Sequence, residues 1–155
     1  MSAEPGTGQP PVQSSLPAAT RIVIPSDPVA VQQGLKALFD TLLLRQLDEA
    51  DRGRAELVLA EALNNIVEHA YAEAGGEIEL TLCLNGQGLN CRIVDHGAPM
   101  PGEALPQGIL DAPEDLPEGG FGWYLIRTLA EDLRYARVAD QNQLTFRLTT
   151  EQSAA

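Results

Sequence analysis

The segment from Glu61 to His69, EALNNIVEH, holds the densest group of side chains that could do chemistry. On a helix, which turns by about 100° per residue, one side would carry Glu61, Asn65, Glu68 and His69. The carboxylate of Glu61 could accept a proton, and the amide oxygen of Asn65 is a hard ligand of the kind that Mg²⁺ prefers. Asn64 and Asn65 are poor residues inside a helix, because their amides compete for backbone hydrogen bonds. The alternative to a site is a solvated polar face.

A second motif, DHG over residues 95–97, comes at the end of a predicted strand. Asp95 shares the parity of Leu89, Cys91 and Ile93, so it faces the helices if those apolar side chains do. A carboxylate in that position costs free energy unless a donor meets it, and the exocyclic amine of a purine is one such donor. Gly97 would let a flat ring approach the backbone. The alternative is that Asp95 only caps the turn before Gly97.

A glycine-rich run, GGFGW over residues 119–123, precedes a predicted helix. Glycines that open a helix expose backbone N–H groups at its positive end, which is a ready site for phosphate. The run lacks the Lys-Ser/Thr ending of a P-loop, and the alternative is a flexible hinge. Together the three motifs would supply a base with a metal ligand, an acceptor for an amine, and an amide-rich phosphate cradle.

A fold of strands and helices must position these motifs. Residues 1–19 are rich in Pro, Gly and Ser, so we expect a disordered tail before one domain over 20–150 and a short tail over 151–155. The predicted elements are a strand at 21–24, a helix from a cap at Ser26 or Asp27 to about Leu47, a helix at 50–71, strands at 77–84 and 89–95, a long loop at 97–119, a helix at 121–133, and strands at 135–138 and 143–148. Three helices on one face of a mixed, mostly antiparallel sheet make an α+β two-layer sandwich.

The hairpin at residues 77–95 shows how the pairing register follows from the turn. Ile78, Leu80, Leu82 and Leu84 alternate with polar residues and should face the helices. If Leu84 opposes Leu89 across the turn NGQG, then Cys83 opposes Asn90 and the two cysteines of the chain point to opposite faces of the sheet. A disulfide between them is not expected, which fits a reducing compartment.

The formal net charge of −12 over 155 residues narrows the possible partners. Such a surface repels phosphate backbones and anionic lipid, so we expect no nucleic-acid or membrane partner. No apolar run approaches the roughly 18–20 residues of a membrane span, and no signal-peptide pattern opens the chain. We therefore expect a cytoplasmic protein whose partner is another protein.

The order and spacing of the three motifs resemble those of the GHKL (Bergerat-fold) ATPases, and most of all the RsbW-like anti-sigma-factor serine/threonine kinases. The resemblance covers residues 20–150, and its most specific piece is the Glu-x-x-x-Asn helix followed by His69-Ala70-Tyr71. It implies that Glu61 is a general base and that Asn65 binds Mg²⁺. It also implies that a lid spans about 99–119. The ATP-binding set implied is Asn64, Asn65, Glu68, His69, Asp95, Gly97, Gly119, Gly120, Phe121, Gly122, Trp123 and Thr145.

In such kinases the substrate is a serine of a STAS-type anti-anti-sigma protein, and the kinase sequesters a sigma factor and works as a homodimer. The resemblance implies the same activity here, with ATP and Mg²⁺ as cofactors. One departure is that residues 97–126 hold five acidic residues and no Lys or Arg, while phosphoryl transfer depends on positioned positive charge. The alternatives are therefore a nucleotide-binding regulator that sequesters its partner without transferring phosphate, and an interaction domain with no ligand.

Overall fold

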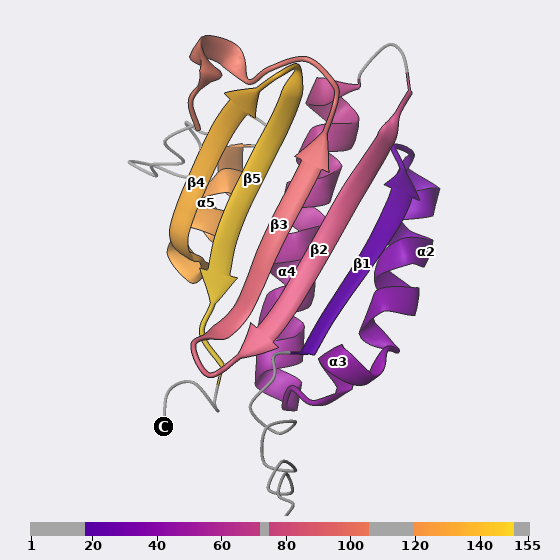
Figure 1. Ribbon diagram of the computed structural model, residues 1–155, viewed down its shortest axis with the longest axis vertical. Helices are drawn as coiled ribbons and strands as arrows, with labels where there is room; N and C mark the ends of the chain where they lie inside the picture. The colour runs from indigo at the N-terminus through magenta and orange to yellow at the C-terminus, as the bar shows by residue number, and fades with distance from the viewer. Residues whose placement is uncertain (1–17, 72–74, 106–119, 151–155) are drawn as a thin grey trace, which may run out of the picture.

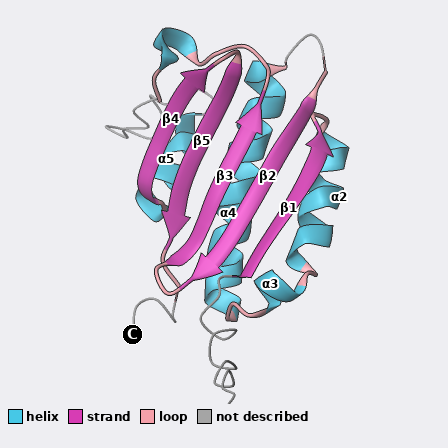
Figure 2. Ribbon diagram, in the orientation of Figure 1, coloured by secondary structure: helices cyan, strands magenta, loops and turns pink. Residues whose placement is uncertain are grey.

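A five-stranded sheet with helices against one face forms the described part of the chain (Figures 1 and 2). The computed structural model describes residues 18–71, 75–105 and 120–150. The strand order is β1-β2-β3-β5-β4, and each neighbouring pair is antiparallel. The expected two-layer α+β sandwich is confirmed. The expectation of a mixed sheet is wrong for the described strands, because every connection between sheet neighbours returns antiparallel.

Strand β2 (Glu77–Asn85) and strand β3 (Gly88–Asp95) form the hairpin at the centre of the sheet. Leu84 opposes Leu89 and Cys83 opposes Asn90, which confirms the predicted register. The inward residues of β2 form part of the core, with exposed fractions of 0–6 %: Ile78, Leu80, Leu82 and Leu84. The two cysteines are free; Cys91 is buried and Cys83 half-buried.

The first strand and helix differ from the prediction in their lengths. Strand β1 runs over Ala18–Pro25, so residues 18 and 19 belong to the sheet rather than to the tail; residues 1–17 lie outside the described ranges. Helix α2 (Pro28–Phe39) is capped by Asp27, whose carboxylate accepts from the Ala30 N–H at 2.9 Å. The chain then leaves helical geometry at Thr41, and α3 (Leu42–Arg45) forms a separate turn. This break lets Leu43 and Leu44 turn into the core.

Helix α4 (Glu49–Asn65) continues into the π-turn η2 (Ile66–Ala70). The Tyr71 N–H donates to the Ile66 carbonyl at 3.2 Å, five residues back, which widens the last turn. Such single wide turns occur often at functional sites, and this one carries His69. The predicted helix at 50–71 is thus present, with a π-turn at the end that the apolar pattern did not indicate.

The last helix is shorter than predicted, and the strand after it is longer. Helix α5 covers Gly120–Leu129, and β4 begins at Glu131 and ends at Val138. Asp132 has a φ of 54° where the pairing of β4 with β5 (Gln141–Leu148) shifts register. This bulge absorbs the sharp reversal between α5 and β4. A 3₁₀ turn, η3 (Pro101–Glu103), lies in the predicted long loop, whose residues 106–119 are outside the described ranges.

Candidate functional site

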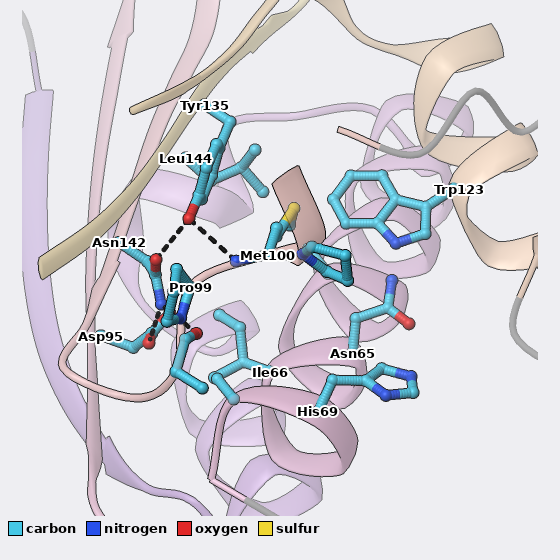
Figure 3. A pocket seen from close by; sticks show the side chains of 14 residues that line it. Asn65, Ile66, His69, Asp95, Pro99, Met100, Trp123, Tyr135, Asn142 and Leu144 are labelled. Atoms are coloured by element: carbon cyan, nitrogen blue, oxygen red, sulfur yellow. Dashed lines mark hydrogen bonds between the residues drawn. The ribbon is translucent and has the colours of Figure 1, made fainter. Parts of the chain in front are cut away.

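A cavity of about 460 Å³ lies between the helix layer and the β3–β5–β4 end of the sheet (Figure 3). The last turns of the α4–η2 helix form one wall with Ala62, Asn65, Ile66, His69 and Ala70. The end of β3 and the segment after it form a second wall with Asp95, Ala98, Pro99, Met100 and Pro101. Trp123 of α5 and three residues of the β4–β5 hairpin close the ring: Tyr135, Asn142 and Leu144. The cavity therefore brings residues of all three predicted motifs together.

The predicted site residues on the α4–η2 helix fall into two groups, those that line the cavity and those that do not. Asn65 is only 9 % exposed, and its Nδ2 atom has no hydrogen-bond partner although it is buried. His69 lines the cavity beside it (Figure 3). Asn64 and Glu68 are exposed and do not line the cavity, because they lie on the solvent side of the helix.

Glu61 lies one turn before Asn65 and is half-buried against α5. A Cβ atom added at Gly122 would collide with Glu61 Oε1. A side chain at position 122 would therefore displace the Glu61 carboxylate from its place against α5. Gly120 is the first residue of α5. Gly119 lies outside the described ranges, as does the side chain of Phe121, whereas Trp123 is buried and lines the cavity.

Asp95 is 3 % exposed and faces the helix layer, as its parity predicts. Its Oδ1 atom accepts from the Gly97 N–H at 2.9 Å, which is the turn cap considered as the alternative. The same atom accepts from Asn142 Nδ2 at 2.8 Å. The turn cap and a ligand-facing position are thus compatible, since Asp95 also lines the cavity.

The segment after Asp95 is held by η2 on one side. The Ala98 N–H donates to the Ala70 carbonyl at 2.9 Å, and a Cβ atom at Gly97 would collide with that carbonyl. Tyr71 Oη accepts from the His96 N–H at 2.5 Å and donates to the Glu77 carbonyl at 3.0 Å. Burial and the nearby carboxylates of Asp95 and Glu77 raise the pKa of Tyr71, while the hydrogen bond from His96 lowers it. The phenol therefore stays protonated and can donate.

The β4–β5 hairpin holds the same segment from the other side, through residues that the motifs did not indicate. Asn142 Nδ2 donates to the Ala98 carbonyl at 2.8 Å. Arg137 Nη1 donates to the Gly97 carbonyl at 2.7 Å, and Tyr135 Oη accepts from the Met100 N–H at 3.1 Å. The only signal in the sequence was the inward parity of residues 142 and 144 on the last strand.

The expected place of Thr145 beside the ligand is wrong for this cavity. Along β5 the burial alternates, with Asn142 and Leu144 inward and Thr145 outward. Thr145 instead lines a second hollow, of about 380 Å³, on the open face of the sheet. Arg92 and Arg134 are its register partners on the two neighbouring strands. Asn142 and Leu144 take the positions on β5 that face the cavity.

Charge and metal ligands are sparse around the cavity. Of the residues that the structure describes, no Lys or Arg lines it. No group of three or more His, Cys, Asp or Glu in the described ranges is arranged to hold a metal ion. A metal here would need ligand oxygens from a bound anion, with the Asn65 amide as a single protein ligand. Within the same ranges, no helix has the length and apolar character needed to cross a bilayer.

Comparisons with known proteins show what the chain is similar to. The model of a family described as histidine kinase-like ATPase domain matches residues 24–148. The serine-protein kinase RsbW of Bacillus thuringiensis (strain Al Hakam) is 37 % identical over 84 residues, which cover 51 % of this chain and 52 % of that protein. Proteins of the same name from Bacillus mycoides (strain KBAB4) and Bacillus cereus (strain AH187) match to the same extent.

The chain spans about half the length of the curated relatives it matches. Among solved structures, the histidine kinase domain of a blue-light activated histidine kinase from Erythrobacter litoralis EL346 aligns with a TM-score of 0.48 and 24 % identity. That alignment covers 66 % of this chain and 46 % of the other.

Proposed function

Because the chain belongs to the histidine kinase-like ATPase domain family, we propose that it is an ATP-dependent serine/threonine protein kinase that also acts as an anti-sigma factor. The observation that carries the proposal is the meeting of Asp95, Asn65 and the start of α5 around one cavity. The 37 % identity to serine-protein kinases over half of the chain supports the same activity. The acceptor we propose is a serine of a STAS-type anti-anti-sigma protein.

We place the adenine of ATP at the end of the cavity that β3 and β5 form. Asp95 accepts a hydrogen bond from the exocyclic amine, which compensates the cost of burying a carboxylate. Ile66, Met100 and Leu144 line the cavity with apolar atoms against which a flat ring can pack. Gly97 does not line the cavity itself; its close contact with the Ala70 carbonyl holds the segment that carries Ala98, Pro99 and Met100 against η2.

We place the phosphates of ATP at the other end of the cavity, near Asn65 and the start of α5. The backbone N–H groups of the first turn of α5 point along a positive helix end and can bind phosphate oxygens. The unpartnered atom of the buried Asn65 amide is the donor Nδ2, which fits an acceptor such as a phosphate oxygen, while Oδ1 would be the ligand of Mg²⁺. Mg²⁺ bound to Asn65 and the phosphates would supply the positive charge that neutralises the triphosphate.

Glu61 is the proposed general base. Its carboxylate touches Gly122 in the first turn of α5, so it lies beside the proposed phosphate end. In the transfer, the serine hydroxyl oxygen bonds to the γ-phosphorus as the bond from that phosphorus to the β–γ bridging oxygen breaks. The serine proton passes to Glu61, and ADP leaves.

The test is transfer from γ-labelled ATP to a STAS-type partner with a single acceptor serine. We expect Glu61→Ala to reduce transfer by at least about 100-fold, the usual effect of losing a general base, while the ATP dissociation constant changes by only a few fold. Glu56→Ala, an exposed glutamate on the same helix, is the matched control and should transfer normally. Equal transfer by the two variants would remove Glu61 from the mechanism.

A nucleotide-binding regulator without transferase activity is the second candidate. It is favoured by the acidic segment at 97–126 and by the absence of Lys and Arg from the described cavity lining. Mg-ATP at 100 times its dissociation constant should stabilise either protein by about 2.7 kcal/mol. Stabilisation without a phosphorylated partner would select the regulator, and no stabilisation would reject both.

The remaining parts of the proposal concern assembly and location. We propose a homodimer in the cytoplasm that sequesters a sigma factor and releases it when the STAS-type partner binds. These parts rest on the motif resemblance, as does the choice of acceptor. Light scattering on the purified chain tests the dimer, and a binding competition between the two partners with and without ATP tests the exchange.

A further inference from the structure

Asn142 lies at the meeting point of the polar groups in the sheet wall of the cavity. It is 6 % exposed and is paired with Asp95 in the register between β5 and β3. Figure 3 shows its amide between the Asp95 carboxylate and the Tyr135 hydroxyl. None of the three sequence motifs contains this residue, and it has no role in the mechanism proposed above.

The orientation of the Asn142 amide is fixed by its neighbours. Its Oδ1 atom accepts from Tyr135 Oη at 2.5 Å and from Arg137 Nη1 at 3.1 Å. A guanidinium can only donate, so the amide oxygen must face Arg137 and the NH₂ group must face away from it. The NH₂ group therefore points to Asp95 Oδ1, 2.8 Å away, and to the Ala98 carbonyl.

This orientation determines which oxygen of Asp95 is available to a ligand. Asn142 and the Gly97 N–H both donate to Oδ1. Within the described ranges no hydrogen bond reaches Oδ2, and the residue lines the cavity. Oδ2 is not one of the described buried side-chain atoms without a partner, so it is open to the cavity. Oδ2 is thus the atom left to accept from an amine.

The same amide connects this carboxylate to the wall that follows it. Asn142 holds the Ala98 carbonyl, and its partner Tyr135 holds the Met100 N–H at 3.1 Å. Both Ala98 and Met100 line the cavity. One buried side chain therefore sets the direction of the amine acceptor and the position of the apolar wall beside it.

We propose that Asn142 is the positioning residue for base recognition. Its NH₂ group donates to Oδ1 of Asp95, so that Oδ2 alone is free to accept from the exocyclic amine of the purine. This inference rests on the proposed function only in that the ligand is ATP. Asn142 is a positioning residue because it acts through Asp95.

The test compares ATP with purine riboside triphosphate, which lacks the exocyclic amine. The ratio of the two dissociation constants measures what the amine contributes. In the wild type we expect at least about a tenfold preference for ATP, the usual worth of a hydrogen bond to a charged group. In Asn142→Ala we expect the ratio to fall to within about twofold of unity, as in Asp95→Ala. Affinity for the purine analogue should change little.

The control is Gln143→Ala, the next residue on β5, which faces the opposite side of the sheet. It should keep the wild-type ratio. A merely structural role for Asn142 would weaken both nucleotides equally and leave the ratio unchanged, which would overturn the proposal. Circular dichroism and the denaturation midpoint establish that each variant is folded.

The near-isosteric variant Asn142→Asp provides a second readout if the alanine variant does not fold. It places a carboxylate against Asp95, so the pair should share a proton at low pH, with Arg137 and Tyr135 facing it from β4 and His69 across the cavity. When protonated, the introduced carboxyl group can donate to Asp95 as the amide does. The loss of ATP affinity relative to wild type should therefore be larger at pH 8 than at pH 5.5. A loss independent of pH would contradict the proposal.

The outcomes also separate this inference from the proposed function. If the wild type shows no preference for ATP over the analogue, the assignment of Asp95 fails and the inference with it. If the wild type and Asn142→Ala share the preference while Asp95→Ala loses it, only the role of Asn142 fails. Phosphoryl transfer does not enter either comparison.

Discussion

Burial of the Asn65 amide costs free energy that no described hydrogen bond to its Nδ2 atom compensates. Its Nδ2 atom has no partner, and an unpaired buried polar group costs about 1–3 kcal/mol. Ser26 Oγ is the other described side-chain atom in this condition, and it lies far along the chain in the turn before α2. Asn65 differs from Ser26 because it lines the cavity. A ligand that contacts Asn65 would recover the lost interaction.

We predict that Asn65→Leu keeps or raises the stability of the free protein while it weakens Mg-ATP binding by at least about tenfold. The substitution keeps the number and branching of the side-chain heavy atoms and removes the unpaired group, so the free energy of unfolding should rise by up to about 1 kcal/mol. Denaturant unfolding and calorimetric titration measure the two effects. Asn64→Ala, at the exposed neighbour, should leave Mg-ATP binding unchanged and gain about 0.5 kcal/mol of stability from the better helix propensity of alanine. A large loss of stability in Asn65→Leu would indicate that the amide has a structural role instead.

The sequence predicts some of these residues and misses others for a physical reason. The inward direction of Asp95 follows from the two-residue period of its own strand, as does the register of the hairpin. Asn142 and Tyr135 act through pairings between β3, β5 and β4, which bring together residues far apart in the chain. Thr145 was misplaced because a shift of one residue in a strand moves a side chain to the opposite face.

At the scale of elements, the π-turn η2 and the segment after β3 are joined by a backbone hydrogen bond and a close contact. Ala70 offers its carbonyl to Ala98, and Gly97 sits against that carbonyl with no room for a side chain. The apolar spacing of α4 predicts a regular helix to its end, because Ile66 and Ala70 lie four residues apart, as they would on a regular helix. Local spacing could not reveal the extra residue in the turn.

We predict that Gly97→Ala destabilises the protein by about 1–3 kcal/mol and weakens nucleotide binding, because the new methyl group meets backbone that cannot rotate away. Gly53→Ala is the matched control. Gly53 lies inside α4 with no atom near the added methyl group, so this variant should gain about 0.5–1 kcal/mol. Urea unfolding of both variants measures the difference. Equal stabilities would show that η2 and the loop separate without cost.

Helix ends were the least predictable part of the fold. The apolar residues from Val31 to Leu47 continue at helical spacing, yet the chain breaks at Thr41. Thr41 Oγ1 donates to the Leu38 carbonyl at 2.6 Å. This carbonyl at the end of α2 thereby gains a hydrogen bond in place of the one that a continuous helix would supply. Similarly, residues 131–133 belong to β4, where Glu131 pairs with Arg147, rather than extend α5. At Thr41 the burial of Leu43 and Leu44 goes with the break, and at Glu131 strand pairing ends the helix; the local sequence alone contains neither piece of information.

At the scale of the whole molecule, the two faces of the sheet have different roles. The inner face packs on the helices and provides the sheet wall of the cavity (Figure 1). The outer face is open, and four arginines lie on it although the chain is acidic overall: Arg21, Arg92, Arg134 and Arg147. The cysteines divide in the same way, with Cys91 inward and Cys83 outward.

We predict that one thiol per chain reacts with a disulfide reagent under native conditions and that the second reacts only after unfolding. Burial raises the pKa of the Cys91 thiol, so Cys91 stays protonated and unreactive as the pH rises from 7 to 9. Cys83 is half-buried at the edge of the outer hollow and remains accessible. Cys83→Ser should abolish the native reaction. Continued reaction in that variant would mean that Cys91 is reached by opening of the sheet.

The cavity lining begins at Ala62 and uses no described residue before it. Strand β1, helix α2 and helix α3 form a flank at the far edge of the sheet, joined to the rest through β2 and α4. During evolution the exposed surface of the flank can therefore change without a change in the described residues that line the cavity. Because no described residue of the flank lines the cavity, relatives that share residues 62–145 need not share the exposed surface of the flank, nor a protein partner that would bind there.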